Sequence, residues 1–303
     1  MNIKNTNDRR HELNGVLVVT LAFLLWGIMP IYWKALSHVS APSILANRII
    51  WSFVFTAILV QYQSRWKEFK TGINSPKELM FLFFRAFFIG INWLIFIWGI
   101  NNGHVLECSL GYFINPLMVV LLGCIFLKEN LSKYQIFALL LTCTGVLLLI
   151  INYGYIPWIA LLIAITFAFY ALLKKTSNSE ALTGLTAEVA VLTVPALIYL
   201  AVISFKSQSS YFLEGSIATN FLLVFSGVVT AVPLLLYANG LRKIRLSLGG
   251  LLQYIAPTCT FFLGVFIFKE SFTRVHLISF IIIWISLIIF SWSSFPKKRV
   301  TSA

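Results

Sequence analysis

Long apolar runs separated by short polar segments set the pattern of this chain from residue 15 to residue 292. Each run is about twenty residues long, the length that a helix needs to cross ~30 Å of hydrocarbon. The runs do not alternate as barrel strands would, and a helix satisfies its own backbone in lipid. We therefore predict an all-α protein with ten transmembrane helices, at residues 15–34, 43–62, 79–100, 104–127, 133–151, 155–173, 182–205, 217–240, 246–268 and 275–292.

Composition places the chain in the membrane class. Hydrophobic residues make up 59% of it and charged residues only 11%, whereas a soluble domain carries about 25% charged residues. This excludes a soluble enzyme, a disordered chain and a nucleic-acid module, despite the net charge of +13. The four cysteines form no CxxC pair and no metal-binding spacing, so they are interpreted as small buried hydrophobes.

Charge predicts the orientation. With the N-terminus inside, 17 of the 23 Lys and Arg residues fall in cytoplasmic segments and four fall outside. The remaining two, Arg48 and Arg85, lie within spans. This bias supports ten spans with a cytoplasmic N-terminal tail (1–14) and a cytoplasmic basic C-terminal tail (293–303). We expect a multi-pass protein of a bacterial inner membrane.

An internal repeat appears when the sequence is shifted by 141 residues. Pro116 then falls on Pro257, and the pair Lys128-Glu129 falls on Lys269-Glu270. The matched segments end the fourth and ninth spans, an odd number of crossings apart. We therefore predict two five-helix repeats of opposite orientation, 15–151 and 155–292, the architecture of alternating-access transporters.

Several motifs add a family resemblance. They are Trp26-Gly27-x2-Pro30-x-Tyr32-x-Lys34, Arg48-x2-Trp51-Ser52, Asn92-Trp93-Leu94, Glu107-x-Ser109-Leu110-Gly111-Tyr112-Phe113-Ile114-Asn115-Pro116, Phe167-Ala168-Phe169-Tyr170 and Gln253-Tyr254-Ile255-x-Pro257-Thr258. Over nearly its whole length the chain resembles the drug/metabolite transporter superfamily with paired EamA domains. Within that superfamily it resembles the RarD-type, chloramphenicol-sensitive permease-like subfamily.

The resemblance implies ten helices around a central cavity, lined by the first, third, fourth, sixth, eighth and ninth helices. It implies small metabolites or drugs as cargo, with export as the direction. Relatives carry an acidic residue and a histidine where this chain has Ser43 and Asn47. The start of the second span is therefore a poor source of a titrating carboxylate.

Charged residues inside the spans are the first site candidates, because a charge in the bilayer needs a partner, water or a function. Arg48 and Arg85 could line the cavity or snorkel to an interface, and Lys34 could be an anchor or the cavity lip. Glu107 and Glu188 could couple transport to protons or form structural pairs. All candidates for the cavity or coupling are Trp26, Lys34, Arg48, Arg85, Trp93, Trp98, Glu107, Tyr112, Asn115, Tyr170, Glu188, Tyr237, Gln253 and Tyr254.

Prolines inside spans predict helix kinks, because each removes a backbone hydrogen bond. The kink candidates are Pro30, Pro116, Pro233 and Pro257. Pro116 and Pro257 occupy equivalent repeat positions, which predicts a symmetric pair of bends.

The function hypothesis is a secondary transporter of small organic solutes. There is no GxxxxGK[ST] motif for ATP, no HExxH motif and a single aspartate, Asp8. A polytopic enzyme or a channel remain the alternatives. We expect no cofactor, metal or nucleic acid, with a small-molecule substrate, the lipid bilayer and a coupling proton as partners.

The inverted repeat predicts where two equivalent lysines lie. A thiol reagent that cannot cross the membrane should label Lys128→Cys only from the cytoplasmic side and Lys269→Cys only from outside, in a cysteine-free background. Labelling of both positions from one side would contradict the inverted repeat.

Overall fold

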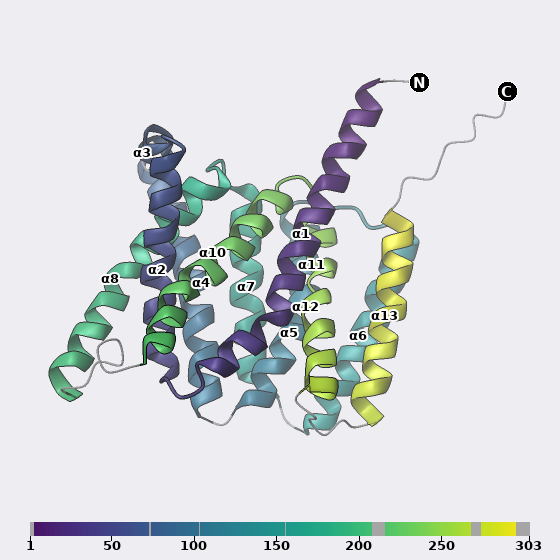
Figure 1. The fold of residues 1–303 in the computed structure, drawn as a ribbon. Helices are drawn as coiled ribbons and strands as arrows, with labels where there is room; N and C mark the ends of the chain where they lie inside the picture. Colours follow the sequence, from purple (N-terminus) through teal and green to yellow (C-terminus); the bar gives the residue numbers. More distant parts are fainter. Residues whose placement is uncertain are drawn as a thin grey trace.

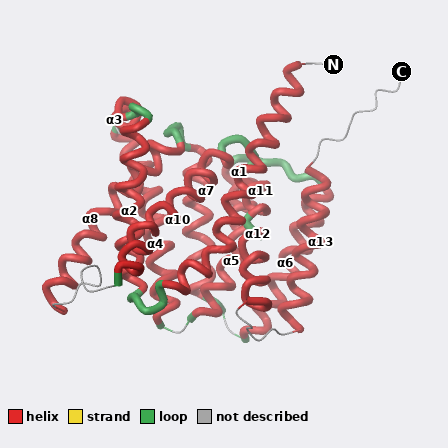
Figure 2. Tube along the Cα trace, in the orientation of Figure 1, coloured by secondary structure: helices red, strands yellow, loops and turns green. Residues whose placement is uncertain are grey.

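The computed structural model describes residues 3–72, 74–102, 104–154, 156–207, 216–267 and 274–294, and within these ranges it contains helices and turns but no strand (Figure 1, Figure 2). The helices are α1 (Ile3–Ala35), α2 (Ala41–Tyr62), α3 (Trp66–Gly72), α4 (Pro76–Asn101), α5 (Val105–Phe126), α6 (Lys133–Tyr153), α7 (Trp158–Thr176), α8 (Ala181–Ser207), α10 (Ile217–Leu241), α11 (Leu246–Leu252), α12 (Ile255–Phe262) and α13 (Arg274–Ser294), with a π-helical turn, η1 (Leu263–Ile267), after α12.

Every predicted span coincides with helical structure, the ninth being shared by α11, α12 and η1. Within the described part of the chain, seven helices are long and apolar enough to cross a membrane, and α5 and α13 contain shorter apolar segments. The chain is therefore an all-α, polytopic membrane protein. The short helix α3, between α2 and α4, was not predicted.

The ninth span is interrupted just before Pro257. Proline has no N–H to donate to the carbonyl of Gln253, and that carbonyl accepts from the N–H of Ala256 instead, at 3.1 Å. Helix α11 ends at Leu252 and α12 begins at Ile255. Helix α5 continues through Pro116, so this interruption has no counterpart there.

For description we group α1, α10 and α11/α12 as triad A, and α4, α5 and α7 as triad B. The groups are not separate: α11 packs mainly on α5 of triad B, and α10 packs on α2 as well as on α1. Helices α2 and α8 form one pair, and α6 and α13 form the other. The two pairs lie toward opposite sides of the bundle in Figure 1.

The main hydrophobic core lies where the two triads meet. Its buried residues include Phe23 of α1, Tyr170 of α7 and Tyr237 of α10. Helix α1 begins and α13 ends at the same end of the bundle (Figure 1), which we call the termini end. The remaining end is called the opposite end.

Candidate functional site

A buried network of charged side chains lies in the half of the bundle nearer the termini end. Arg85 Nε of α4 and Lys174 Nζ of α7 both contact Glu188 Oε1 of α8, at 2.9 and 2.7 Å. The hydroxyl of Tyr170 donates to Glu188 Oε2 at 3.2 Å. The side chains of Arg85 and Glu188 are 2% and 0% exposed. The network therefore joins three helices and satisfies both carboxylate oxygens.

The carboxylate of Glu188 offsets the cost of burying Arg85 and Lys174 in the membrane. A charge at the bilayer centre costs about 2.5–3.5 kcal/mol, and Arg85 does not snorkel to water, because its guanidinium is buried against Glu188. Two cations share one carboxylate, so the network keeps one net positive charge.

Lys174 was counted from the sequence as a loop cation, and that interpretation is wrong. Helix α7 continues to Thr176, beyond the predicted end of the span at residue 173, and carries Lys174 into the bundle. Its position four residues after Tyr170 places both on one helix face, which is the signal that could have identified it.

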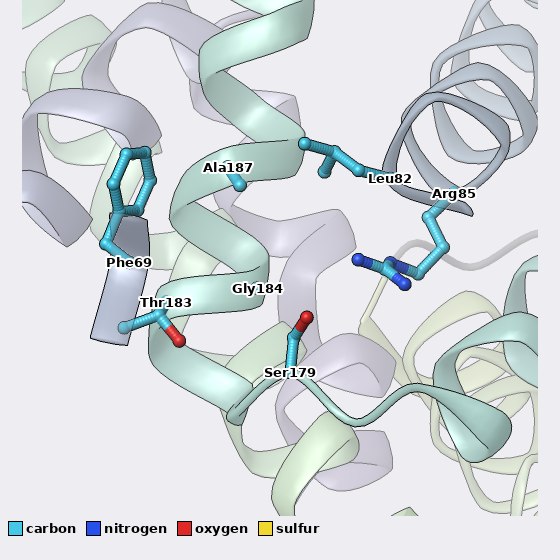
Figure 3. Close-up of a pocket in the computed structure, with 7 residues that line it drawn as sticks. All are labelled: Phe69, Leu82, Arg85, Ser179, Thr183, Gly184 and Ala187. Atoms are coloured by element: carbon cyan, nitrogen blue, oxygen red, sulfur yellow. The ribbon is translucent and has the colours of Figure 1, made fainter. Parts of the chain in front are cut away.

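A small pocket borders Arg85 of the network (Figure 3). The guanidinium of Arg85 lies at its wall, opposite the turn that carries Ser179 and the first turns of α8. The complete lining is Phe69, Leu82, Arg85, Ser179, Thr183, Gly184 and Ala187. One member of the charged network therefore borders a pocket.

A cluster of aromatic rings forms the middle of the bundle. The Trp26 indole lies 5.7 Å from the ring of Tyr237 and 6.4 Å from that of Phe167. Phe167 in turn lies 5.9 Å from Tyr170, between ring centroids. These contacts connect α1 and α10 of triad A with α7 of triad B, and they continue to the charged network.

Buried polar groups lie in the same part of the bundle. The side chains of Tyr237 and Gln253 are close enough to interact with each other, and Asn115 Oδ1 has no hydrogen-bond partner in the described part of the chain. Tyr254, by contrast, donates to the carbonyl oxygen of Phe113 at 2.8 Å. Because unsatisfied polar groups are costly in a membrane, Asn115 Oδ1 marks a position where a polar solute or water would gain a hydrogen bond.

Arg48 lies on α2, toward the opposite end of the bundle. Its Nε donates to Thr230 Oγ1 at 3.2 Å. The guanidinium carbon lies 4.5 Å from the ring centroid of Trp93 and 5.2 Å from that of Trp33. Each cation–π contact contributes about 0.5–2 kcal/mol, so the two indoles offset part of the cost of placing this cation in the bundle.

Hydrogen bonds join the two triads at the termini end. The Glu129 carboxylate, just after α5, accepts from the backbone N–H groups of Leu246 and Ser247 at 2.6 and 2.9 Å. These groups begin α11, where free N–H groups and the helix dipole favour an anion. Lys128, at φ 53°, adopts the left-handed conformation that ends α5 and turns the chain toward α11.

A second contact between the triads uses Lys175 of α7. Its Nζ donates to the carbonyl oxygens of Leu241, Arg242 and Ile244, at 2.9, 3.2 and 2.5 Å. A cation at the C-terminal end of α10 satisfies carbonyls that the helix leaves free. The two triads are thus fastened at the termini end by one anion and one cation.

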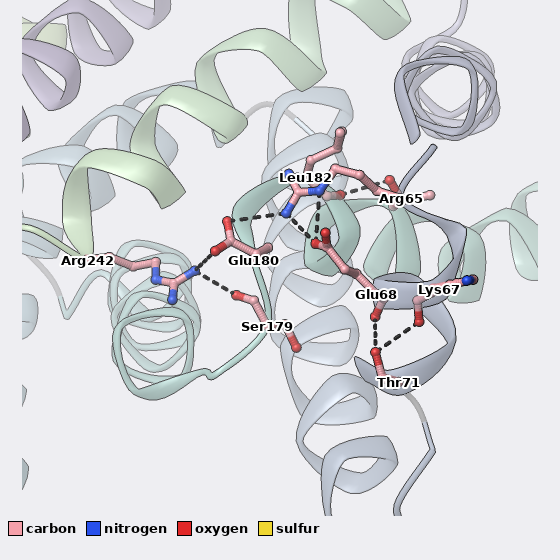
Figure 4. A network of polar contacts seen from close by, with 9 residues as sticks. Arg65, Lys67, Glu68, Thr71, Ser179, Glu180, Leu182 and Arg242 are labelled. Atoms are coloured by element: carbon pink, nitrogen blue, oxygen red, sulfur yellow. Dashed lines mark hydrogen bonds and ion pairs between the residues drawn. The ribbon is translucent and has the colours of Figure 1, made fainter. Parts of the chain in front are cut away.

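An exposed ionic network joins residues next to α3, α8 and α10 (Figure 4). Glu180 lies 3.7 Å from both Arg65 and Arg242, and Arg65 also pairs with Glu68. The guanidinium of Arg65 lowers the pKa of Glu68, chiefly through their hydrogen bond. Solvent screens such exposed pairs, so they stabilise this end of the bundle less than the buried contacts do.

Some predicted site residues are not brought together. Trp98 is 52% exposed and stacks on His104, and Lys34 is exposed at the end of α1. The side chain of Glu107 lies outside the described residues. Sequence reasoning missed Trp33, Thr230 and Phe167 as parts of the sites, since tryptophan at a span end is typical of an interfacial anchor.

The described residues contain no group of three or more His, Cys, Asp or Glu side chains that could hold a metal ion. The fold and the buried polar sites define a class: a helical membrane protein with ionisable and aromatic side chains between its helices. Intramembrane ionisable residues of this kind mark pathways for solutes or ions in membrane proteins.

Comparison with known proteins names the family within this class. The model of the EamA-like transporter family matches residues 13–151 and again residues 155–292. The chain belongs to the EamA-like transporter family.

Individual relatives match over almost their whole length. The chain is 41% identical to the uncharacterized transporter YojE of Bacillus subtilis, covering 95% of this chain and 97% of the relative. It is also 41% identical to the protein RarD of Escherichia coli, covering 97% and 99%. A crystal structure with 15% identity aligns with a TM-score of 0.70 over 92% of this chain and 98% of the other, which supports the fold alone.

The charged network predicts losses of stability of different size for two substitutions. Glu188→Gln leaves two buried cations without an anion and should lower stability by about 3–5 kcal/mol. Lys174→Met leaves the balanced Arg85–Glu188 pair and should cost no more than about 1.5 kcal/mol. The thermal unfolding midpoint of detergent-purified protein measures both.

The double variant Lys174→Met/Glu188→Gln is the matched control. It leaves one uncompensated cation instead of two, and its unfolding midpoint should lie between those of the single variants. Equal midpoints for Glu188→Gln and the parent protein would contradict the role of Glu188.

Proposed function

We propose that the chain is a secondary transporter that moves small organic metabolites or drugs across a bacterial inner membrane by alternating access. Ten spans, two inverted repeats, cytoplasmic termini and net export are parts of this proposal. The names of the relatives, which include transporters and a chloramphenicol-sensitive RarD protein of Pseudomonas aeruginosa at 28% identity, support a transported solute.

The pairing of helix contacts is the observation that carries the proposal. Number the helices of each predicted repeat one to five. Contact α1·α10 then joins helix one to helix three of the other repeat, and α7·α4 is its equivalent. In the same way, α5·α7 and α1·α12 both join helix four of one repeat to helix one of the other. Contacts α2·α10 and α8·α4 both join helix two of one repeat to helix three of the other. Contacts α2·α8, α5·α11 and α6·α13 join equivalent helices directly.

This exchange pattern supports an internal two-fold relation between the repeats. Each triad contains helices of both repeats, so the repeats are interlocked rather than separate bodies. The triads together comprise the six helices that the family resemblance assigns to the cavity. We therefore assign the alternating movement to triad A against triad B, with the α2/α8 and α6/α13 pairs as the supports between them.

The contacts of Glu129 and Lys175 supply a gate for this movement. Both join triad B to triad A at the termini end, and the excess of Lys and Arg assigns that end to the cytoplasm. The described conformation is thus the one in which access from the cytoplasm is closed. Opening exchanges these hydrogen bonds for water, as alternating access requires.

Counterflow tests the transport function directly. Solutes whose distribution changes between cells with and without the protein identify a candidate cargo. Proteoliposomes preloaded with that unlabelled cargo should then accumulate the labelled cargo transiently, and empty liposomes should not. A channel gives no counterflow and an enzyme changes the solute chemically, so either result would overturn the proposal.

Glu129→Ala should open the cytoplasmic end. The substitution leaves the first N–H groups of α11 without their acceptor. Loss of a helix N-cap costs about 0.5–2 kcal/mol, which corresponds to roughly a two- to thirtyfold shift from the closed toward the open form. Ser247→Cys, buried in the closed form, should then react faster with a maleimide in a background without the four native cysteines.

Glu180→Ala is the matched control, because it removes an exposed carboxylate at the same end. It should change the reactivity of Ser247→Cys less than twofold, as expected for exposed ion pairs. If Glu129→Ala leaves the reactivity at the parent rate, the assignment of Glu129 to the gate is wrong.

A further inference from the structure

Arg48 has unused hydrogen-bonding capacity. A guanidinium carries five N–H donors, and Nε donates to Thr230. No described residue accepts a hydrogen bond from the four terminal N–H groups, and no described carboxylate forms an ion pair with Arg48. The indoles of Trp93 and Trp33 contact the guanidinium through their ring systems. The two cation–π contacts offset only part of the free-energy cost of removing Arg48 from water. They supply no hydrogen-bond acceptor in the plane of the guanidinium.

The internal symmetry shows what is missing beside Arg48. The shift of 141 residues places Asn47 at the position of Glu188 and Trp33 at that of Lys174. Asn47 is buried and donates to the carbonyl oxygen of Ser43 at 3.0 Å. One end of the bundle therefore has a carboxylate to neutralise its cations. At the opposite end, the position equivalent to Glu188 holds the neutral amide of Asn47, and Arg48 is the next residue in the chain.

The surroundings of Arg48 are aromatic. Trp93 packs against the same hydrophobic core as Trp26. Tyr112 of α5 is near enough to Arg48 to interact with it electrostatically. An acceptor for Arg48 would thus have indole and phenol rings beside it, which favour a planar apolar body.

We infer that Arg48 binds the acidic group of an amphipathic organic acid, with the apolar, planar part of that molecule against Trp33, Trp93 and the neighbouring aromatic rings. The guanidinium presents its terminal N–H groups to a carboxylate in a two-point contact. This inference rests on the proposed transport function and specifies its cargo as an organic anion.

Matched ligands test the acidic group. Benzoate, phenylacetate and indole-3-acetate are compared with benzamide, phenylacetamide and indole-3-acetamide, and with acetate, which lacks a ring. Binding to detergent-purified protein is measured from tryptophan fluorescence and from the rise of the unfolding midpoint. At least one aromatic acid should bind, while its amide and acetate should bind about tenfold or more weakly, as expected for loss of a charge-assisted contact or of the apolar body.

Variants test the role of Arg48. Arg48→Gln should weaken binding of the acid by about tenfold or more. Arg48→Lys should give an intermediate affinity, because it keeps the charge and loses the two-point geometry. Arg274→Gln removes an exposed cation at the start of α13 and should leave the affinity within about twofold, as expected for an exposed charge.

Several results would overturn the inference. They are absence of binding by all three acids to folded parent protein, equal binding of acids and amides, and equal affinity in folded Arg48→Gln and parent protein. If Arg48→Gln does not fold, Arg48→Lys decides, and parent affinity in that variant counts against the two-point contact.

Counterflow on the same preparation separates this inference from the transport function. Counterflow of a neutral solute that persists in Arg48→Gln, without acid binding, would retain the carrier and overturn the anion site. Binding of an acid that depends on Arg48, in a protein without counterflow of any solute, would retain the site and overturn the carrier.

Discussion

The cost of a charge inside the bilayer is the constraint on which this structure depends. Water is not available there to solvate an ion, so each buried cation needs an anion, an aromatic face or a ligand. Glu188 meets that need for Arg85 and Lys174 and in doing so binds α4, α7 and α8 together. At the opposite end, Arg48 meets tryptophan rings and a threonine instead. The two ends of the bundle therefore satisfy the same constraint in different ways.

Much of the fold was predictable because lipid imposes a simple pattern on the sequence. Helix lengths follow from the bilayer thickness, and the predicted ranges coincide with helices, including a ninth range that is broken before Pro257. The 141-residue shift was visible because Pro116, Lys128 and Glu129 have equivalents in one register. The number of spans and their sidedness rest on charge counts and stay predictions.

The partners within the bundle were less accessible to sequence reasoning. Arg85, Tyr170 and Glu188 were candidates, yet their association is set by the packing of α4, α7 and α8, which no local pattern encodes. Lys174 was assigned to a loop because a lysine near the end of an apolar run is typical of the interface, and a one-turn difference in the helix end reversed that assignment. Trp33 resembled an anchor for the same reason, although its ring contacts Arg48.

In the proposed mechanism, contacts between helices of the two predicted repeats determine which interactions a movement would break. If each repeat were a separate body, rocking would break contacts throughout a long interface. In the observed arrangement, most polar contacts within a triad, such as those of Asn92 with α7, can persist while the triads move. Those between triads are concentrated in a few groups, including Glu129 and Lys175. In the proposed transport mechanism, a small number of hydrogen bonds at one end would control access, because most contacts within each triad would be kept.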